Sequence, residues 1–425
     1  MSHHTAREAY QQLGERLNRF PQGAPPSEML YKILGVLVSE QEAAFLAALP
    51  IRPFTARRAA KALHMTVPEA TTTLDTLASR AMLIDIVKEG EETRYMMPPP
   101  MAGFIEFALM RVRTDIDQQL LSELYHQYLN VEGEFMHDLF YGVETKLGRV
   151  FVQELMVSES EAVHILDYER ATHVIETAEH IAVGMCYCRH KMEHMGMACN
   201  APMDVCLTFG NVADALSRHG HSRAIGKSEA LDTLARSYEA NLVQCGENVR
   251  QGVSFICNCC GCCCEAMLAA KRYGLRQPVY TTGFSPLVEE ASCVGCGKCA
   301  KVCPVDAIQM ATGHIGEREH SVARIDYDIC LGCGVCVRNC PPKCIDLKAN
   351  DKKVLTPVNS THRIVLAAIE KGQLANLVFD TPAFASHRAM GTLLTVILRL
   401  PPIKRAMASE QMKSKYLARL IAGRK

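Results

Sequence analysis

The cysteines of this 425-residue chain are confined to one stretch of the sequence. All 20 lie between residues 186 and 344, and neither residues 1–185 nor residues 345–425 contain one. The first residues, MSHHTAREAY, lack an apolar export signal, and no run of about eighteen apolar residues is present. We therefore expect a cytoplasmic chain, in whose reducing surroundings clustered thiols serve more often as metal or cluster ligands than as disulfides.

The second part of this stretch contains a duplicated motif. Both copies read C-x2-C-x2-C-x3-C followed by proline, at Cys293, Cys296, Cys299 and Cys303 and again at Cys330, Cys333, Cys336 and Cys340. Glycines between the cysteines, such as Gly295 and Gly332, let each loop curl tightly because they carry no Cβ. The spacing is typical of a run in which three thiolates bind one [4Fe–4S] cluster and the fourth binds another. Zinc sites pair C-x2-C units rather than tripling them, which argues against zinc here.

The segments SCVGCGKCAKVCPVDAI and ICLGCGVCVRNCPPKCI resemble the two halves of a bacterial-type 2[4Fe–4S] ferredoxin, over residues 285–350. The resemblance implies that cluster one binds Cys293, Cys296, Cys299 and Cys340, and that cluster two binds Cys330, Cys333, Cys336 and Cys303. The chain between the motifs is longer than in the smallest ferredoxins, which predicts an inserted loop around residues 313–319. Cys344 stands where the first half has Ala307, and we expect it to be a small buried residue.

A second group of cysteines lies in residues 165–284. Six of them fall within eight residues, in the segment CNCCGCCC, and such close neighbours cannot all pair as disulfides. We expect at least one further iron–sulfur cluster here, with zinc or redox-active thiols as alternatives. The candidate ligands, of which the binding subset stays open, are Cys186, Cys188, Cys199, Cys206, Cys257, Cys259, Cys260, Cys262, Cys263 and Cys264.

Three further expectations concern this middle region. In an extended chain, the two thiols of a C-x-C pair are expected to point to opposite sides, so that only one of them binds. Cys245 is expected in the core, and His190 and His194 are expected to be ordinary, hydrogen-bonded histidines. The cysteine pattern also resembles a segment of ferredoxin-fused proteins of anaerobic bacteria and archaea, which implies a cluster protein without a settled function.

The first 100 residues predict a winged-helix-like domain. Helical segments begin near Ser39, Thr55 and Val67, and the segment LIDIVKEGEETRYMMP predicts a hairpin that turns at Gly90. The helix that would read DNA carries Glu69 and Asp75, and the hairpin is also rich in glutamate. Because these charges repel phosphates, the sequence argues against DNA binding and favours a role in protein docking.

Two helical parts flank the cysteine-rich stretch. Residues 101–164 predict a helical connector, in which an amphipathic helix over residues 104–128 would pack its apolar stripe into a core. Residues 351–425 predict a helical tail that is basic from residue 388 onwards. That tail could pack against the front domain, dock on an acidic partner or contact an anionic membrane surface as a peripheral segment.

Together these features predict an α+β multidomain protein with a winged-helix-like domain (1–100), a helical connector (101–164), a cysteine-rich domain (165–284), a ferredoxin domain (285–350) and a basic tail (351–425). The expected function is low-potential electron transfer through two [4Fe–4S] clusters, as a subunit or partner of an oxidoreductase complex. A free carrier would need only residues 285–350. The alternatives are a redox-responsive winged-helix regulator and an oxidoreductase with chemistry at the middle cysteines. No catalytic residue is legible.

Overall fold

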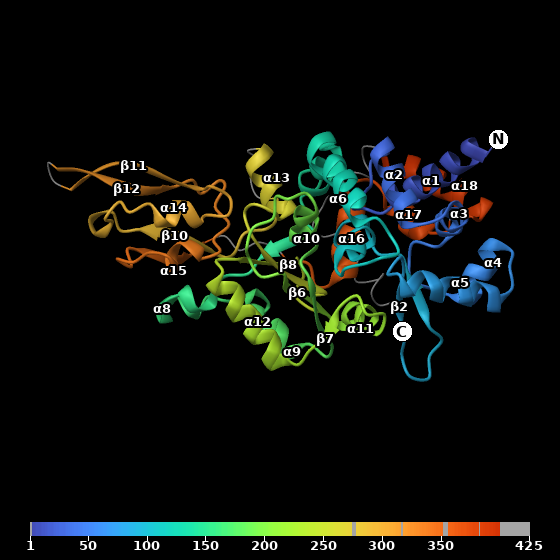
Figure 1. Ribbon diagram of the computed structural model, residues 1–425, viewed down its shortest axis with the longest axis horizontal. Helices are drawn as coiled ribbons and strands as arrows, with labels where there is room; N and C mark the ends of the chain where they lie inside the picture. The colour runs from blue at the N-terminus through green and yellow to red at the C-terminus, as the bar shows by residue number, and fades with distance from the viewer. Residues whose placement is uncertain (1, 274–277, 316–317, 352–355, 382, 400–425) are drawn as a thin grey trace. The chain divides into compact units, whose positions relative to one another are not determined.

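The computed structural model of the chain describes residues 2–273, 278–315, 318–351, 356–381 and 383–399 (Figure 1). It divides the chain into two compact units. Unit 1 comprises residues 1–145, 218–221 and 361–425, and unit 2 comprises residues 146–217 and 222–360. All 20 cysteines therefore belong to unit 2.

Unit 1 is helical except for one small sheet. Its helices and strands are α1 (Ser2–Asn18), α2 (Glu28–Leu37), α3 (Glu40–Ala48), β1 (Phe54–Thr55), α4 (Ala56–Leu63), α5 (Val67–Ser79), β2 (Ile84–Ile86), β3 (Arg94–Met96), α6 (Gln118–His126), α7 (Glu134–Phe140), α16 (Ser360–Glu370), α17 (Leu374–Val378) and α18 (Ala385–Arg399).

The three helices and the hairpin expected in the first 100 residues are present. They follow in the order α3, β1, α4, α5, β2, β3, and the three strands form an antiparallel sheet in the order β1-β3-β2. Capping boxes start two of the helices, because Ser39 and Thr66 each exchange hydrogen bonds with a glutamate three residues later. Gly90 adopts a φ of 74° at the hairpin turn, a conformation that glycine reaches without steric cost.

The expected amphipathic helix over residues 104–128 is wrong. Helical turns end at Leu109, and α6 begins only at Gln118. The Gln118 side chain explains the break, since its Oε1 accepts from the Arg113 backbone N–H at 2.9 Å and its Nε2 donates to two backbone carbonyls at 2.8 Å. These bonds hold an irregular turn in place, and Val112, expected in the apolar stripe, is instead 71% exposed.

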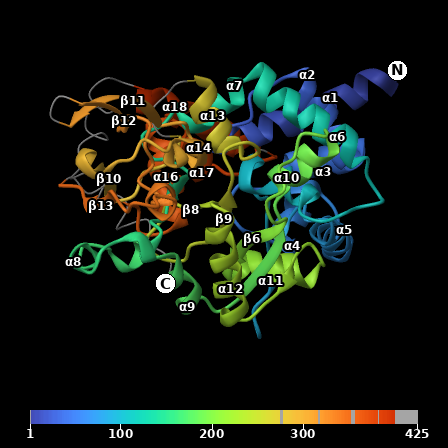
Figure 2. The same ribbon diagram turned by 60° about the vertical axis from the view of Figure 1, so that its left-hand side comes forward.

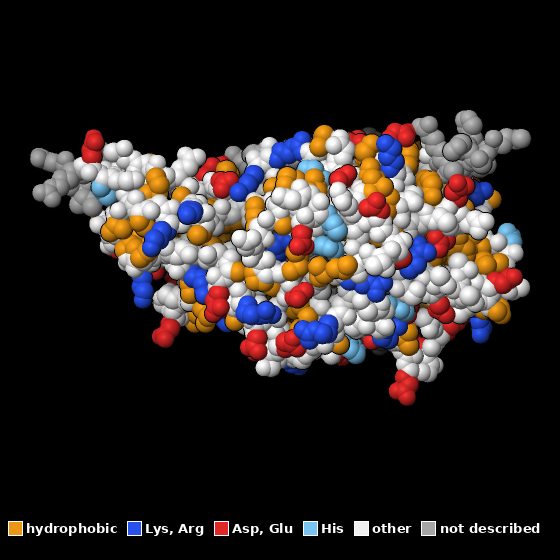
Figure 3. Space-filling model, in the orientation of Figure 1, with side chains coloured by type: hydrophobic (Ala, Val, Ile, Leu, Met, Phe, Trp, Pro, Cys, Tyr) orange, Lys and Arg blue, Asp and Glu red, His pale blue; other side chains and the backbone are white. Residues whose placement is uncertain are grey.

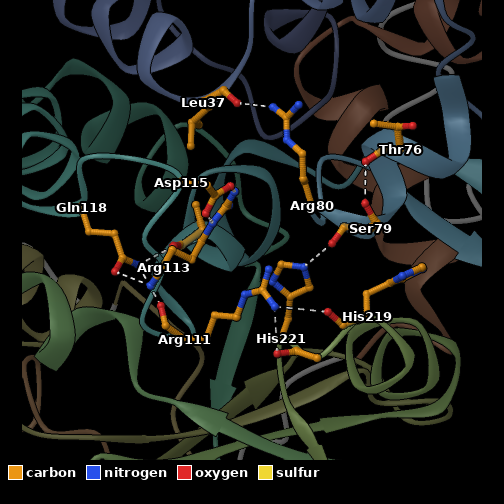
Figure 4. A network of polar contacts seen from close by, with 12 residues as sticks. Leu37, Thr76, Ser79, Arg80, Arg111, Arg113, Asp115, Gln118, His219 and His221 are labelled. Carbon is orange, nitrogen blue, oxygen red and sulfur yellow. Dashed lines mark hydrogen bonds and ion pairs between the residues drawn. The ribbon is translucent and has the colours of Figure 1, made fainter.

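The short segment Arg218–His221 belongs to unit 1 although it lies far along the chain (Figure 4). His221 Nε2 lies 2.9 Å from the backbone oxygen of Ser79, and Arg111 donates to the backbone oxygens of residues 219 and 220. Arg218 donates to the Asp85 carboxylate at 2.7 Å. The segment is thus held by polar contacts to several parts of unit 1.

This segment should open in mild acid. Burial and the nearby charges of Arg111 and Arg113 together lower the pKa of His221 to about 4, against the opposing hydrogen bond to Ser79. Between that value and the unfolded value of about 6.5, the open state binds a proton that the closed state rejects, so stability falls as pH falls through this window. Corrected for the intrinsic slowing of amide exchange in acid, the protection of peptides covering residues 218–221 should decrease from pH 6.5 to pH 4. His221→Asn should abolish this acid dependence, and an unchanged dependence would contradict the assignment.

Unit 2 contains a six-stranded antiparallel sheet in the order β4-β8-β9-β6-β5-β7 and a smaller ferredoxin-like segment. Its helices and strands are β4 (Gly148–Val150), α8 (Glu159–Ala162), α9 (Ala171–Thr177), β5 (Ile181–Met185), α10 (Tyr187–His194), β6 (Asp204–Phe209), α11 (Gly210–Arg218), β7 (Arg223–Ala224), α12 (Lys227–Glu239), β8 (Val243–Glu247), β9 (Phe255–Cys259), α13 (Glu265–Tyr273), β10 (Phe284–Val288), α14 (Lys298–Val302), β11 (Ile308–Ile315), β12 (Arg318–Ile325), α15 (Val335–Arg338) and β13 (Ile345–Ala349).

The large sheet separates an ordinary apolar core from a sulfur-rich one. Side chains alternate between the faces of a strand, so Leu207 and Ile256 pack with α9 and α12, whereas Cys206, Cys257 and Cys259 face the other way. On that second face lie α10 and α13, the helices that follow Cys186 and Cys264. The strand register thus gathers cysteines that are distant in the sequence.

The ferredoxin-like segment is built from two strand pairs and two short helices. Strands β10 and β13 pair along their whole length, and β11 and β12 form a long hairpin that extends away from the segment (Figures 1 and 2). The insertion expected around residues 313–319 lengthens this hairpin, and residues 316–317 at its tip lie outside the described residues.

Residues 400–425 of the basic tail also lie outside the described residues. Of the helices that are described, none has both the length and the apolar character needed to cross a lipid bilayer.

Candidate metal centres

The four cysteines expected to bind cluster one surround one cavity in the ferredoxin-like segment. Cys293, Cys296, Cys299 and Cys340 all line it, and its empty volume is about 280 Å³. Cys340 therefore joins the three cysteines of the first motif although it belongs to the second. Cys344 also lines this cavity, is 4% exposed as expected, and has its Sγ 3.4 Å from that of Cys340.

The expected cluster-two cysteines surround a second cavity. Cys303, Cys330, Cys333 and Cys336 line a space of about 330 Å³, with Pro304 and apolar side chains completing the wall. Here too, one cysteine of the first motif joins three of the second. The crossed grouping is the one that two iron–sulfur cubes require from this spacing.

The chemistry of both cavities fits an iron–sulfur cluster. Gly295 and Gly332 adopt φ values of 67° and 66°, and a Cβ on either would lie within 2.6 Å of a backbone oxygen, so only glycine permits these loops. Burial raises the pKa of Cys330 to about 11 and that of Cys333 to about 12. These two thiols therefore stay protonated without a metal. A metal that binds them must displace their protons, because the ligand is the thiolate.

Six cysteines of the middle region form a closed ring of thiol contacts on the sulfur-rich face of the large sheet. Their thiols are neighbours in the order Cys186, Cys188, Cys264, Cys259, Cys257, Cys206 and back to Cys186, and Cys259 also neighbours Cys245. We call this set the thiol ring. All of its members are buried except Cys257, which is partly exposed. The ring combines both cysteine groups of the middle region.

The remaining four candidates form a separate and more compact group. The sulfur atoms of Cys199, Cys260, Cys262 and Cys263 all lie within 4.8 Å of one another. We call this set the thiol quartet. Its exposure is graded, since Cys263 is fully buried whereas Cys262 is exposed to solvent. The ten candidates therefore divide into six and four rather than forming one set.

The expectation about C-x-C pairs is wrong. Residues two apart on a strand share a face, so Cys257 and Cys259 point to the same side of β9 and contact each other. Cys245 is buried as expected, on β8, and its thiol contacts that of Cys259. His190 is also buried, and its ring centroid lies 4.6 Å from that of His194. Neither histidine belongs to the thiol quartet.

Arg189 is a functional residue that the sequence analysis missed. Its side chain is fully buried and donates to the backbone oxygen of Asn258 at 3.3 Å. It also hydrogen-bonds to Cys260 of the quartet and lies close enough to Cys186 and Cys206 of the ring for their charges to act on it. A buried cation thus stands between two sets of potential thiolates. Its position directly after Cys188 is the feature of the sequence that could have indicated a role at this site.

A buried ion pair fixes the helices that frame this site. Lys191 on α10 donates to the carboxylate of Glu265, the first residue of α13, and the two side chains are 0% and 1% exposed. Lys191 follows the first cysteine pair by three residues, and Glu265 directly follows Cys264. The pair therefore ties together the two chain segments that supply most of the ring.

The second ferredoxin cavity, rather than the first, adjoins the middle region. Gly261, inside the CCGCCC loop, packs so closely on Pro304 that an added Cβ would lie 2.5 Å from the Pro304 carbonyl oxygen. Gln153, from the connector that precedes the middle region, donates its backbone N–H to the Cys333 carbonyl at 3.0 Å. Lys271 on α13 pairs with Asp306, which follows α14 in the chain, at 3.0 Å. Cys330 and Cys333 share a core cluster with Cys257, Cys259 and Cys264.

Comparison with known proteins identifies one part of the chain. Residues 292–344 match the model of a family described as a 4Fe-4S dicluster domain. The match covers the duplicated motif and both cavities, and it confirms the expectation of a domain that binds [4Fe–4S] clusters. No curated protein and no solved structure matches the chain.

Proposed function

We propose that this chain is an electron-transfer component of an oxidoreductase system, in which the ferredoxin-like segment exchanges electrons with a centre in the cysteine-rich middle region. The observation that carries the proposal is the pair of cavities, each lined by four cysteines drawn from both motifs. The size of the chain around this segment also favours a subunit or docking component over a free carrier.

The cysteine roles follow from the two cavities. Cys293, Cys296, Cys299 and Cys340 would hold cluster one, and Cys303, Cys330, Cys333 and Cys336 would hold cluster two. Bound there, [4Fe–4S] clusters supply one-electron chemistry at potentials set by burial and by hydrogen bonds to sulfur. Backbone N–H groups already point at these sulfurs, since Ala307 donates to Cys303 at 3.2 Å and Gly332 donates to Cys330 at 3.4 Å.

The thiol ring is the proposed site of a further iron–sulfur cluster. Its six sulfurs are enclosed by strands and by α10 and α13, and Arg189 offsets the negative charge that several thiolates would bring into a buried site. The contact of Gly261 with Pro304 supports cavity two as the neighbour through which the middle region exchanges electrons.

This contact gives a prediction. Gly261→Ala should push the CCGCCC loop away from Pro304, because the new Cβ would meet backbone atoms that have no freedom to rotate away. The rate at which dithionite reduces the middle-region iron should fall several-fold, followed by freeze-quench EPR, while total iron stays unchanged. Gly226→Ala is the matched control, since nothing lies within 4 Å of its added Cβ and its φ is −84°. Equal rates in both variants would remove cavity two from the proposed route.

We further propose that the winged-helix-like part of unit 1 docks on protein rather than on DNA. The order of its helices and strands supports the winged-helix prediction. In α5, Asp75 accepts a hydrogen bond from Tyr95 at 2.6 Å, which makes it a structural residue. On the face in Figure 3, Lys and Arg are interspersed with Asp and Glu, without the broad basic patch that phosphates attract.

An anoxic affinity pull-down of the full chain from its native host tests both proposals. Mass spectrometry should find a flavoprotein or another oxidoreductase subunit among the captured proteins, and no specific DNA fragment. If specific DNA co-purifies and no redox partner does, the hypothesis of a redox-responsive winged-helix regulator replaces the electron-transfer hypothesis.

A further inference from the structure

The spacing of sulfur atoms distinguishes a site for one ion from a site for a cluster. When four thiolates bind a single ion tetrahedrally at about 2.3 Å, neighbouring sulfurs are about 3.8 Å apart. When four thiolates bind the corners of a cube, each binds a different iron and points outward, so the sulfurs are further apart. The distances between sulfurs therefore indicate the kind of centre before any metal is present.

The thiol quartet has the spacing of a single ion. The Cys262 and Cys263 sulfurs are 3.7 Å apart, the Cys199 and Cys263 sulfurs are 3.9 Å apart, and all four lie within 4.8 Å of one another. No other group of three or more His, Cys, Asp or Glu ligand atoms in the described part of the chain is this compact. In the two ferredoxin sets and the thiol ring, no three sulfurs lie this close to one another.

We propose that the middle region holds two centres of different kinds: a single divalent ion, Zn²⁺ or Fe²⁺, bound tetrahedrally by Cys199, Cys260, Cys262 and Cys263, and a separate cluster site at the thiol ring. Four thiolates leave no open position on a tetrahedral ion, so the quartet site is structural or, with iron, a one-electron site. It divides the ten candidate cysteines, whose binding subset the sequence left open, between two kinds of centre.

The surroundings of the quartet support this assignment. Three of its cysteines come from the turn between β9 and α13, and Cys199 comes from the loop after α10, so one ion would join the two segments. The Arg189 side chain hydrogen-bonds to Cys260 and offsets part of the net negative charge of a four-thiolate site. Cys262 is exposed, which gives an ion an entry path from solvent.

Inorganic sulfide distinguishes the two kinds of centre, because a cluster contains it and a single ion does not. The full chain, purified without oxygen, is analysed for zinc, iron and acid-labile sulfide. Cys262→Ser and, on the other segment, Cys199→Ser should each lose one metal ion per chain with no loss of sulfide. Cys206→Ser in the ring should lose iron and sulfide together. Met197→Leu, an exposed position near Cys199, should change neither.

X-ray absorption at the zinc and iron edges then tells which ion is present. A zinc edge with four sulfurs at about 2.3 Å, lost in Cys262→Ser, identifies zinc. Because cluster irons also have four sulfur neighbours, iron is identified instead by the loss of one iron per chain at unchanged sulfide. Loss of sulfide in both quartet variants, or retention of every ion in both, would overturn the proposal. The two ferredoxin clusters do not enter this test, so the proposed electron-transfer function stands or fails separately.

Discussion

Replacing Cys340 with serine is expected to remove cluster one, although Cys340 belongs to the second motif. Its side chain lines the same cavity as Cys293, Cys296 and Cys299. In the same way, Cys303→Ser is expected to remove cluster two. Each variant should lose about four iron and four sulfide per chain, the content of one cube. Iron and sulfide analysis gives the loss, and EPR of the reduced protein shows which cluster signal has disappeared.

The crossed assignment is tested by which variants lose the same cluster signal. Cys340→Ser should match Cys293→Ser in its EPR spectrum, and Cys303→Ser should match Cys330→Ser. If Cys340→Ser instead matches Cys330→Ser, each motif binds its own cluster and the crossed assignment is wrong. Cys344 could replace a missing neighbour, because its sulfur lies 3.4 Å from that of Cys340. The double variant with Cys344→Ser excludes this rescue, and Cys344→Ser alone should keep both clusters.

Lys191→Met is expected to be strongly destabilising, although Lys191 is not itself a ligand. It leaves the Glu265 carboxylate buried at 1% exposure without its cation. Breaking a buried ion pair by removing one partner costs about 3–5 kcal/mol, because the remaining charge is desolvated and has lost the opposite charge beside it. For a unit of this size the melting temperature should fall by about 10 °C. Thermal melting under anoxic conditions, followed by circular dichroism, measures the effect.

The double variant Lys191→Met with Glu265→Leu is the control. It removes both charges together, so most of the lost stability should return, as it does when buried pairs are replaced by apolar residues of similar size. If the double variant is as unstable as the single one, the effect comes from lost packing and the ion pair does not hold the two segments. Arg223→Met, which breaks an exposed pair with Glu229, should change the melting temperature little.

The sequence predicted the ferredoxin-like segment almost residue by residue, because its information is local. A cysteine every third residue, with glycines between, fixes a loop around one cluster whatever the rest of the chain does. The two cavities group Cys303 and Cys340 as the resemblance implied. The helix that begins after Ser39 was predicted for the same reason, since its cap acts within a few residues. The cap at Thr66 was not predicted, although the start of its helix near Val67 was.

The division of the middle cysteines could not be read from the sequence, because it depends on strand pairing. Cys206 and Cys257 meet only because β6 and β9 are neighbours in the sheet. The residues Cys259 and Cys260 are adjacent in the chain, yet one joins the ring and the other joins the quartet, since the strand ends between them. The prediction of one helix over residues 104–128 failed for a related reason. The Gln118 side chain forms hydrogen bonds with backbone groups that a continuous helix would pair with one another.

The most direct test of the electron-transfer account is the iron and acid-labile sulfide content of the full chain, purified without oxygen, combined with an EPR-monitored reductive titration. The account predicts more than about eight iron and eight sulfide per chain, with signals from two [4Fe–4S] clusters and a further signal that depends on the thiol ring. A chain with about eight iron, and no signal beyond two clusters, would contradict the middle-region cluster. A chain that binds only zinc and contains no sulfide would contradict the whole account.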